Sequence, residues 1–304
     1  MLLHQALRPG RPARTRIAAM RLGQLDIQIV PDARFRLDGG AMFGVVPKIL
    51  WEKKARPDEQ NRIPVATNCL LVRGKDFVAV VDAGVGQKWD AKSRQMYGIE
   101  EQTTLERSLA AQGIQPADVD ALVLSHLHFD HSGAATRGNG GAVVPAFPRA
   151  TVYVQQAELD HARRPHERDR ASYREENWEP LAAAGLLTPV DGEYEIRPGV
   201  TVVPVRGHNE GMQAVRVESE GKTAFFFSDA VPTSAHVPVP WTMAYDLYPV
   251  ELIQNKKRLT DEAAREGWLC IFVHDPDVPW GKIVDEVNGK RRVHPVALEA
   301  TRFD

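Results

Sequence analysis

The chain has little of what would mark a secreted, membrane-bound or nucleic-acid-binding protein. It has only two cysteines in 304 residues, Cys69 and Cys270, and both lie in apolar runs far apart. We expect two buried free thiols, which fits a reducing compartment and predicts a cytoplasmic protein. No apolar run approaches the roughly 18–20 residues that cross a bilayer. The formal net charge is -2, so neither nucleic acid nor a membrane is favoured as a partner.

The start of the chain is basic and lacks the apolar core of a secretory signal. The arginines that precede the first acidic residue, Asp26, are Arg8, Arg11, Arg14, Arg16 and Arg21. We predict that residues 1–22 are a disordered basic extension and that residues 23–304 form a single domain. Met20 is a candidate for the true start, because the sequence MRLGQLDIQIV reads directly into a first strand.

Strand and helix patterns alternate along the rest of the chain, which predicts a layered α/β domain. Helices are predicted at about 103–112, 171–187 and 249–266. Irregular loops are predicted at 38–64 and 230–248, and loops of that length are usually functional or disordered. The predicted strands are 23–30, 67–73, 76–82, 119–125, 151–154, 200–206, 214–218, 222–228 and 268–273.

The strongest chemical signal is the segment SHLHFDHSG at 125–133. It places His126, His128, Asp130 and His131 within six residues, directly after an apolar strand. Residues at i and i+2 point the same way on extended backbone, so the first two imidazoles leave the strand together. Imidazole with a nearby carboxylate is a donor set for zinc, iron or manganese. The segment therefore predicts a metal site.

Three further candidate ligands each follow a predicted strand. His208 follows 200–206, Asp229 follows 222–228 and His274 follows 268–273. In layered α/β proteins, sites form beyond the carboxyl ends of strands. A single histidine after a strand is usually a turn residue, but together with the segment at 125–133 these three predict one shared metal site.

The motifs and their order resemble the metallo-β-lactamase superfamily. SHLHFDH is followed by GH at 207–208, SD at 228–229 and VHD at 273–275, and VVDAGVG at 80–86 matches an early motif. The resemblance covers roughly residues 23–290. It implies a four-layer αββα sandwich and two divalent metal ions, of which zinc is the first candidate and manganese, iron and cobalt are alternatives.

The resemblance also implies a role for each ligand. The implied ligands are His126, His128 and His208 for the first metal, Asp130, His131 and His274 for the second, and Asp229 as the bridge between them. Asp82 matches an aspartate that orients a ligand through a hydrogen bond. Two such metals can share a hydroxide, because metal binding lowers the pKa of water to about 7. This hydroxide would attack a carbonyl carbon or a phosphorus, with Asp130 or Asp229 handling the proton.

Ligand identity narrows the substrate class within the superfamily. His128 replaces the glutamate of the redox-active diiron members, and Asp229 argues against a β-lactamase as the main activity. The chain most resembles the lactonase and methyl-parathion-hydrolase-like group. We expect hydrolysis of a small-molecule lactone or other carboxylic ester, by a chain that can form a homodimer. The alternatives are a phosphotriesterase, a β-lactamase-like activity, a metal-binding regulatory protein and an RNA hydrolase.

Two regions are candidates for contacting the substrate. The segment 39–54 resembles the substrate-side loop of that group, and Phe43 and Trp51, together with Val45 and Ile49, are candidate walls of an apolar pocket. Ordinary core or dimer packing is the alternative for these residues.

The second region is the loop 230–248. Homoserine lactonases carry a tyrosine three residues after the bridging aspartate, where this chain has Pro232. We expect that Tyr245 or His236 replaces this tyrosine in catalysis and that Tyr248 lines the pocket, although surface or packing roles are open for all three.

Overall fold

Two seven-stranded sheets form the centre of the computed structural model, which describes residues 19–287 and 290–297. The first sheet contains β1 (Met20–Leu22), β2 (Leu25–Asp38), β3 (Arg62–Arg73), β4 (Val78–Val81), β5 (Ala121–Val123), β8 (Thr151–Gln155) and β9 (Leu187–Val190), in this order. The second contains β10 (Tyr194–Arg197), β11 (Val200–Pro204), β12 (Gln213–Ser219), β13 (Lys222–Phe226), β14 (Leu269–Ile271), β15 (Trp280–Asp285) and β16 (Arg291–Pro295). A separate hairpin joins β6 (Thr136–Asn139) to β7 (Ala142–Pro145).

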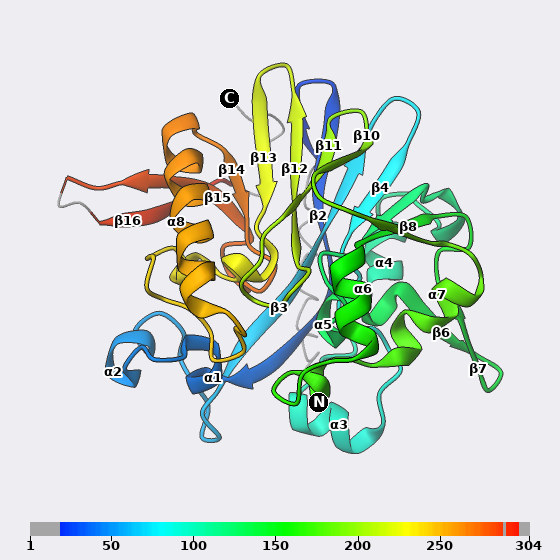
Figure 1. The fold of residues 1–304 in the computed structure, drawn as a ribbon, viewed down its shortest axis with the longest axis horizontal. Helices are drawn as coiled ribbons and strands as arrows, with labels where there is room; N and C mark the ends of the chain where they lie inside the picture. Colours follow the sequence, from blue (N-terminus) through cyan, green and yellow to red (C-terminus); the bar gives the residue numbers. More distant parts are fainter. Residues whose placement is uncertain (1–18, 288–289, 298–304) are drawn as a thin grey trace, which may run out of the picture.

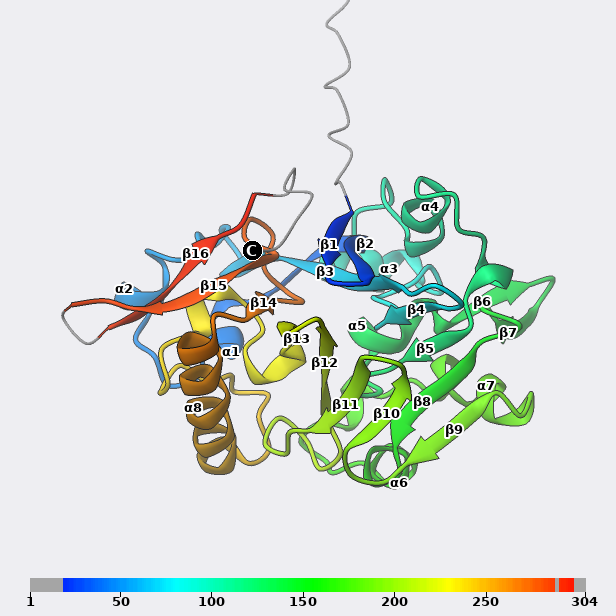
Figure 2. The same ribbon diagram turned by 90° about the horizontal axis from the view of Figure 1, so that it is seen from above.

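Helices lie around the two sheets. They are α1 (Gly39–Phe43), α2 (Lys48–Trp51), α3 (Ala91–Tyr97), α4 (Leu105–Ala110), α5 (Phe129–Ser132), α6 (Gln156–Arg163), α7 (Glu179–Ala183) and α8 (Pro249–Glu266). In Figure 1, α8 lies outside the second sheet, and α4, α6 and α7 lie outside the first, with both sheets between them. Figure 2 shows the same order of layers from above. The predicted four-layer αββα sandwich is confirmed.

Apolar clusters fill the spaces between these layers. One cluster lies between the sheets and joins side chains such as Ile29 and Leu70 to Val215 and Phe226. Another packs α4, α6 and α7 against the first sheet, and a third packs α8 against the second. Strands that are covered on both faces need near-continuous apolar residues, which explains runs such as the one in β3.

The strand directions bring the carboxyl ends of several strands to one edge. β4, β5, β8 and β9 run parallel, and so do β13 and β14. Backbone hydrogen bonds join the two sheets at this edge: Asn68 N–H donates to the Val273 carbonyl and Gln213 N–H to the Ser125 carbonyl, both at 2.8 Å. These hydrogen bonds therefore fix the position of the loops of one sheet relative to the loops of the other.

Two sequence predictions need correction here. Residues 20–22 are not part of a disordered extension, because Met20 and Leu22 are fully buried and β1 pairs with Leu25–Ile27. Residues 1–18 lie outside the described part of the chain. The predicted helix at 171–187 is wrong: α7 spans only five residues, and Leu187 begins β9, which pairs with β8. Gly185 lies just beyond the end of α7, but the residues from Leu187 onward pair with β8 instead of belonging to a helix.

The remaining long predicted elements are close to those observed. α8 has the predicted bounds, and α4 is capped by Thr104, whose side chain accepts from the Arg107 N–H. The predicted loop at 38–64 contains the short helices α1 and α2. Within residues 19–287 and 290–297, no helix is both long enough and apolar enough to cross a membrane.

Candidate metal centre

The candidate ligands gather where the carboxyl ends of the strands meet. Asp82 follows β4, His126 and His128 follow β5, Asp130 and His131 lie on α5, His208 follows β11, Asp229 follows β13 and His274 follows β14. All of them are buried. The structure thus brings together side chains that are up to 192 positions apart, from Asp82 to His274.

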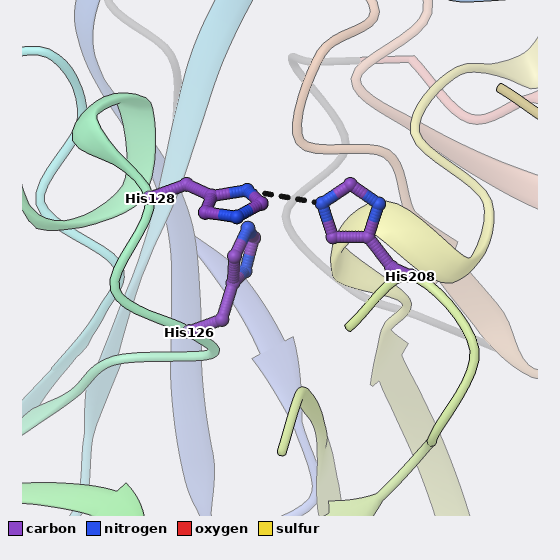
Figure 3. A group of neighbouring side chains, drawn as sticks. All are labelled: His126, His128 and His208. Atoms are coloured by element: carbon purple, nitrogen blue, oxygen red, sulfur yellow. Dashed lines mark hydrogen bonds between the residues drawn. The ribbon is translucent and has the colours of Figure 1, made fainter. Parts of the chain in front are cut away.

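Three imidazoles form the first half of the centre. Ligand atoms of His126, His128 and His208 all lie within 4.8 Å of one another. Figure 3 shows the three rings converging, with the His128 Nδ1 to His208 Nε2 contact of 3.1 Å drawn as a dashed line. We call this group the first half-site.

Asp130, His131 and His274 form the second half-site. The Nε2 atoms of His131 and His274 are 3.1 Å apart, and Asp130 Oδ2 lies 3.5 Å from His274 Nε2. Asp229 stands between the two half-sites. Its Oδ1 lies 3.1 Å from His274 Nε2 and its Oδ2 lies 3.3 Å from His208 Nε2, so each oxygen faces a different half-site.

Acceptors in the first sheet hold the outer nitrogens of the second half-site. His131 Nδ1 donates to Asp82 Oδ2 and His274 Nδ1 donates to the Ala66 carbonyl, both at 2.8 Å. An acceptor at Nδ1 fixes the proton there, so Nε2 of each neutral ring carries a lone pair. Two lone pairs that face each other at 3.1 Å repel unless a cation, either a metal ion or a proton, lies between them.

Asp82 is held as firmly as the histidine that it orients. Its Oδ1 accepts from the Ser125 N–H at 2.7 Å and its Oδ2 accepts from Ser125 Oγ at 2.9 Å. His126 Nδ1 lies 3.1 Å from the same hydroxyl oxygen, which accepts from the ring because its own proton goes to Asp82. Asp82 has a φ of 59°, a left-handed conformation that is uncommon outside glycine and tends to persist at functional sites.

His208 is oriented by a residue that the sequence reasoning missed. Its Nδ1 donates to Asp246 Oδ1 at 2.9 Å, and Asp246 Oδ2 accepts from the Met243 N–H at 2.7 Å. Asp246 is buried and lies in the loop 230–248. The only signal in the sequence was the length of this loop, since no motif or spacing marks the carboxylate.

The charges of the centre fit divalent cations. His126 Nε2, His128 Nε2 and Asp229 Oδ1 are buried and have no hydrogen-bond partner among the described residues. Burial lowers the pKa of His126 and His128 well below the usual range, so both rings are neutral donors of lone pairs. Burial acts the same way on His131, but the carboxylates of Asp229, Asp82 and Asp130 outweigh it and raise its pKa. The pKa values of His208 and His274 are raised in the same way, by nearby carboxylates of which Asp229 acts most strongly. The centre therefore has a negative potential that favours bound positive charge, which fits a site for cations.

Aromatic side chains form a wall beside the second half-site. The Trp89 and Phe129 rings are 5.3 Å apart, Tyr97 lies 5.2 Å from Phe129, and the Arg174 guanidinium lies 4.2 Å from the centre of the Trp89 ring. Burial raises the pKa of Tyr97, and the nearby charge of Asp130 adds to this effect. Trp89 and Tyr97 were not predicted, because no sequence pattern places 89–97 near the ligands. Phe129 lies inside the segment SHLHFDHSG, but no role was predicted for it.

Tyr245 is the predicted substrate-contacting residue that lies near this wall. Burial raises the pKa of its hydroxyl, and the charges of Asp130, Asp38 and Asp229 act in the same direction. Its side chain is partly exposed. The raised pKa keeps its hydroxyl protonated at neutral pH.

Other predicted site residues have different surroundings. His236 is fully buried, with Nδ1 2.7 Å from Thr233 Oγ1 and Nε2 2.8 Å from the Met42 carbonyl oxygen, so neither nitrogen is free for catalysis. Phe43 stacks between His236 and Trp51 at centroid distances of 4.6 and 5.3 Å. Phe43 and Trp51 are core residues rather than pocket walls, because they are only 1% and 2% exposed.

Val45, Ile49 and Tyr248, the remaining candidates for the pocket, do not lie in a pocket wall either. Val45 and Ile49 are 89% and 65% exposed, so they lie on the surface. Tyr248 donates to Glu210 Oε2 at 2.8 Å, and Arg206 lies 4.0 Å from the centre of its ring. Tyr248 therefore belongs to a network of ion pairs at the start of α8 rather than to a pocket wall.

Comparisons with known proteins agree with this architecture. A family model described as the metallo-beta-lactamase superfamily matches residues 62–274. An N-acyl homoserine lactonase of Bacillus cereus is 32% identical over 230 residues, and the alignment covers 71% of this chain and 83% of the lactonase. The structure of a probable metal-dependent hydrolase from Staphylococcus aureus matches with a TM-score of 0.83 and 29% identity, covering 91% of this chain and 100% of that one. The dizinc quorum-quenching lactonase AidC matches in fold, with a TM-score of 0.76 at 19% identity over 92% of this chain and 97% of its own.

Proposed function

Because this chain belongs to the metallo-beta-lactamase superfamily, we propose that it is a dinuclear metal-dependent hydrolase that opens a lactone ring or cleaves a related carboxylic ester. The observation that carries the proposal is the position of Asp229. Its two oxygens face different half-sites, at 3.1 Å from His274 Nε2 and 3.3 Å from His208 Nε2. A carboxylate in this position is suited to join two cations.

The donor set favours zinc. His126, His128 and His208 would hold the first metal, and Asp130, His131 and His274 the second. Nitrogen and carboxylate oxygen are ordinary zinc ligands, although manganese, iron and cobalt accept the same set. When bound, two such cations polarise a carbonyl and lower the pKa of water from about 15.7 to about 7.

The side chains of the protein would do the remaining work. Tyr245 stays protonated because its pKa is raised, so it can donate a hydrogen bond to the substrate carbonyl oxygen. Asp130 and Asp229 would accept and return the proton of the attacking water. Asp82 and Asp246 would keep His131 and His208 in the tautomers that present Nε2 to the metals.

A lactone is the preferred substrate class. The Bacillus cereus relative acts on N-acyl homoserine lactones by its name, and it is 32% identical to this chain. In the wall beside the second half-site, the partly exposed rings of Trp89 and Tyr97 would contact an apolar substituent of such a substrate, and the buried Phe129 ring would support them. The same wall would also suit the aryl group of a phosphotriester, which makes phosphotriester hydrolysis the second candidate.

A substrate panel tests the proposal. Zinc-reconstituted protein is given an acyl-homoserine lactone, a simple γ-lactone, an aryl ester, a phosphotriester and a cephalosporin, while proton release is followed. An Asp229→Ala variant, purified identically, controls for traces of contaminating hydrolase. We expect the lactones to react fastest and the variant to lose this activity. If only the phosphotriester reacts, the protein is a phosphotriesterase and not a lactonase. If nothing reacts although two metals are bound per chain, the result favours a metal-binding regulatory protein.

Location and assembly are also part of the proposal. Cys69 and Cys270 are buried and free, which supports a reducing compartment such as the cytoplasm. A homodimer is proposed from the resemblance to the lactonase group, and light scattering of the purified protein decides between one and two chains per particle.

A further inference from the structure

A fully buried carboxylate lies behind the first half-site and takes no part in the proposed reaction. Glu158, on α6, has no exposed surface. Its Oε1 accepts from the Leu127 N–H at 2.8 Å and from the Tyr173 hydroxyl at 3.0 Å. Leu127 is the residue between His126 and His128, so Glu158 holds the peptide that sets the spacing of these two ligands.

Tyr173 extends this contact to His128. Its ring packs edge-on against the His128 ring, with centroids 4.7 Å apart and planes at 72°. The backbones of the same two residues form an isolated antiparallel bridge. Rotation of the His128 ring is therefore limited by a tyrosine that donates its own hydroxyl proton to Glu158.

The same hydroxyl also reaches the loop that carries His208. Tyr173 Oη accepts from Asn209 Nδ2 at 3.1 Å, and Asn209 Oδ1 accepts from the Gly211 N–H at 3.1 Å. A Cβ on Gly211 would lie 2.0 Å from the Glu158 backbone nitrogen, so only glycine lets this loop sit directly on the first turn of α6. His208 and Glu158 are thus linked through Asn209 and Tyr173.

We propose that Glu158 is the positioning residue of the first half-site, tying His126, His128 and His208 to α6 through Leu127, Tyr173 and Asn209. This inference rests on the proposed function, because it assigns a purpose to the geometry of a metal site. Burying a carboxylate is costly, and one of its oxygens, Oε2, has no hydrogen-bond partner among the described residues. A helix that merely packed on the sheet would not need that group. Within the described part of the chain, its hydrogen bonds do not reach Asp130, His131 or His274, so its effect should be confined to one half-site.

The test measures metal affinity in each half-site separately. His274→Ala leaves the first half-site with its three histidines, and His208→Ala leaves the second with its own ligands. Glu158→Ala and Tyr173→Phe are added to each background, and metal-free proteins are titrated with Co²⁺ while visible absorption is followed. Leu159→Ala is the matched control, because Leu159 is the next residue of α6 and is buried in the core without touching these hydrogen bonds.

We expect Glu158→Ala to weaken Co²⁺ binding to the first half-site by about 10- to 100-fold, the usual range for a residue behind a metal ligand. Tyr173→Phe, which keeps the ring on His128, should weaken it less. Neither should change the second half-site, and Leu159→Ala should lower the melting temperature with little change in Co²⁺ affinity. If Glu158→Ala does not fold, Tyr173→Phe decides the question alone.

Two results would overturn the inference, and they are distinguishable from failure of the proposed function. Equal weakening of both half-sites would mean that Glu158 supports the fold in general. Unchanged Co²⁺ affinity and spectra in Glu158→Ala and Tyr173→Phe would mean that it positions nothing. If the wild-type chain itself bound no Co²⁺, the proposed function would fail first and the inference would fall with it.

Discussion

The two half-sites differ in what holds their ligands in place. In the second, His131 and His274 are held by Asp82, directly after β4, and by the carbonyl of Ala66, within β3. In the first, His208 is held by Asp246 from the long loop 230–248, and His128 is held by contacts that come from α6 and Tyr173. One half-site is therefore supported by a sheet and the other by loops and a helix. Changes in the loops should affect the first half-site and leave the second nearly intact.

Asp229 is the candidate ligand whose oxygens face both half-sites, so its removal should have the largest effect. Asp229→Ala removes the oxygens that face His208 and His274. We expect kcat/KM for a lactone to fall by about 1,000-fold or more, at the upper end for loss of one preorganised charge. Bound metal should drop below two per chain, as read by elemental analysis. If the variant kept both metals and full activity, Asp229 would not bridge the two metals.

A paired substitution separates the two supports. Asp246→Asn and Asp82→Asn each keep the shape of the side chain, but an amide can present its NH₂ to the ring and favour the wrong tautomer. We expect Asp246→Asn to lose about 10- to 100-fold in affinity for the first metal and Asp82→Asn to lose the same for the second. Asp82→Asn should also weaken the first metal, but less, because Asp82 orients Ser125 Oγ, which contacts His126 Nδ1. Two-step zinc titrations read the two constants, and the larger loss falling on the same metal in both variants would contradict the division into half-sites.

Tyr245→Phe should have a smaller effect that spares both half-sites. The variant loses one hydroxyl donor, which is worth roughly 3- to 10-fold in rate. We expect kcat for a lactone to fall by that factor, with metal content unchanged. Tyr248→Phe is the matched control, since its hydroxyl donates to Glu210 instead. An equal loss in both tyrosine variants would show that neither hydroxyl contacts the substrate specifically.

The smallest effect on activity is expected for Lys256, which supports the loop of the first half-site from α8. Its Nζ donates to the Trp241 carbonyl at 2.5 Å, and burial lowers its pKa to about 7. The unfolded chain then binds more protons than the folded one between about pH 7 and pH 10.5. Wild-type stability should therefore rise with pH in this window, by up to about 1.4 kcal/mol per pH unit, relative to Lys256→Met. Urea unfolding at pH 7, 8 and 9 measures this, and parallel curves for the two proteins would contradict it.

The residues brought together at the centre could be predicted because each lies in or directly after a recognisable local sequence pattern. Apolar runs ending in His126, His208, Asp229 and His274 mark strand ends, and strand ends meet at one edge of a layered sheet. The assignment of each ligand to a particular metal came from the family resemblance.

The supports could not be predicted, because they depend on tertiary contacts between distant segments. Glu158 and Leu127 are 31 residues apart, and Asp246 and His208 are 38 apart, with nothing in either sequence that marks the pairing. The prediction that the segment 39–54 lines a substrate pocket was wrong for the same reason. Phe43 and Trp51 look like pocket walls in sequence, but His236 stacks on Phe43 and closes that region as core.

Titration of metal-free protein with zinc, while the opening of a simple lactone is followed, tests the central claim most directly. Two cooperating half-sites predict no turnover without zinc, little at one equivalent and full activity only as the second equivalent binds. Full activity at one equivalent, or turnover by the metal-free chain, would contradict a dinuclear hydrolase.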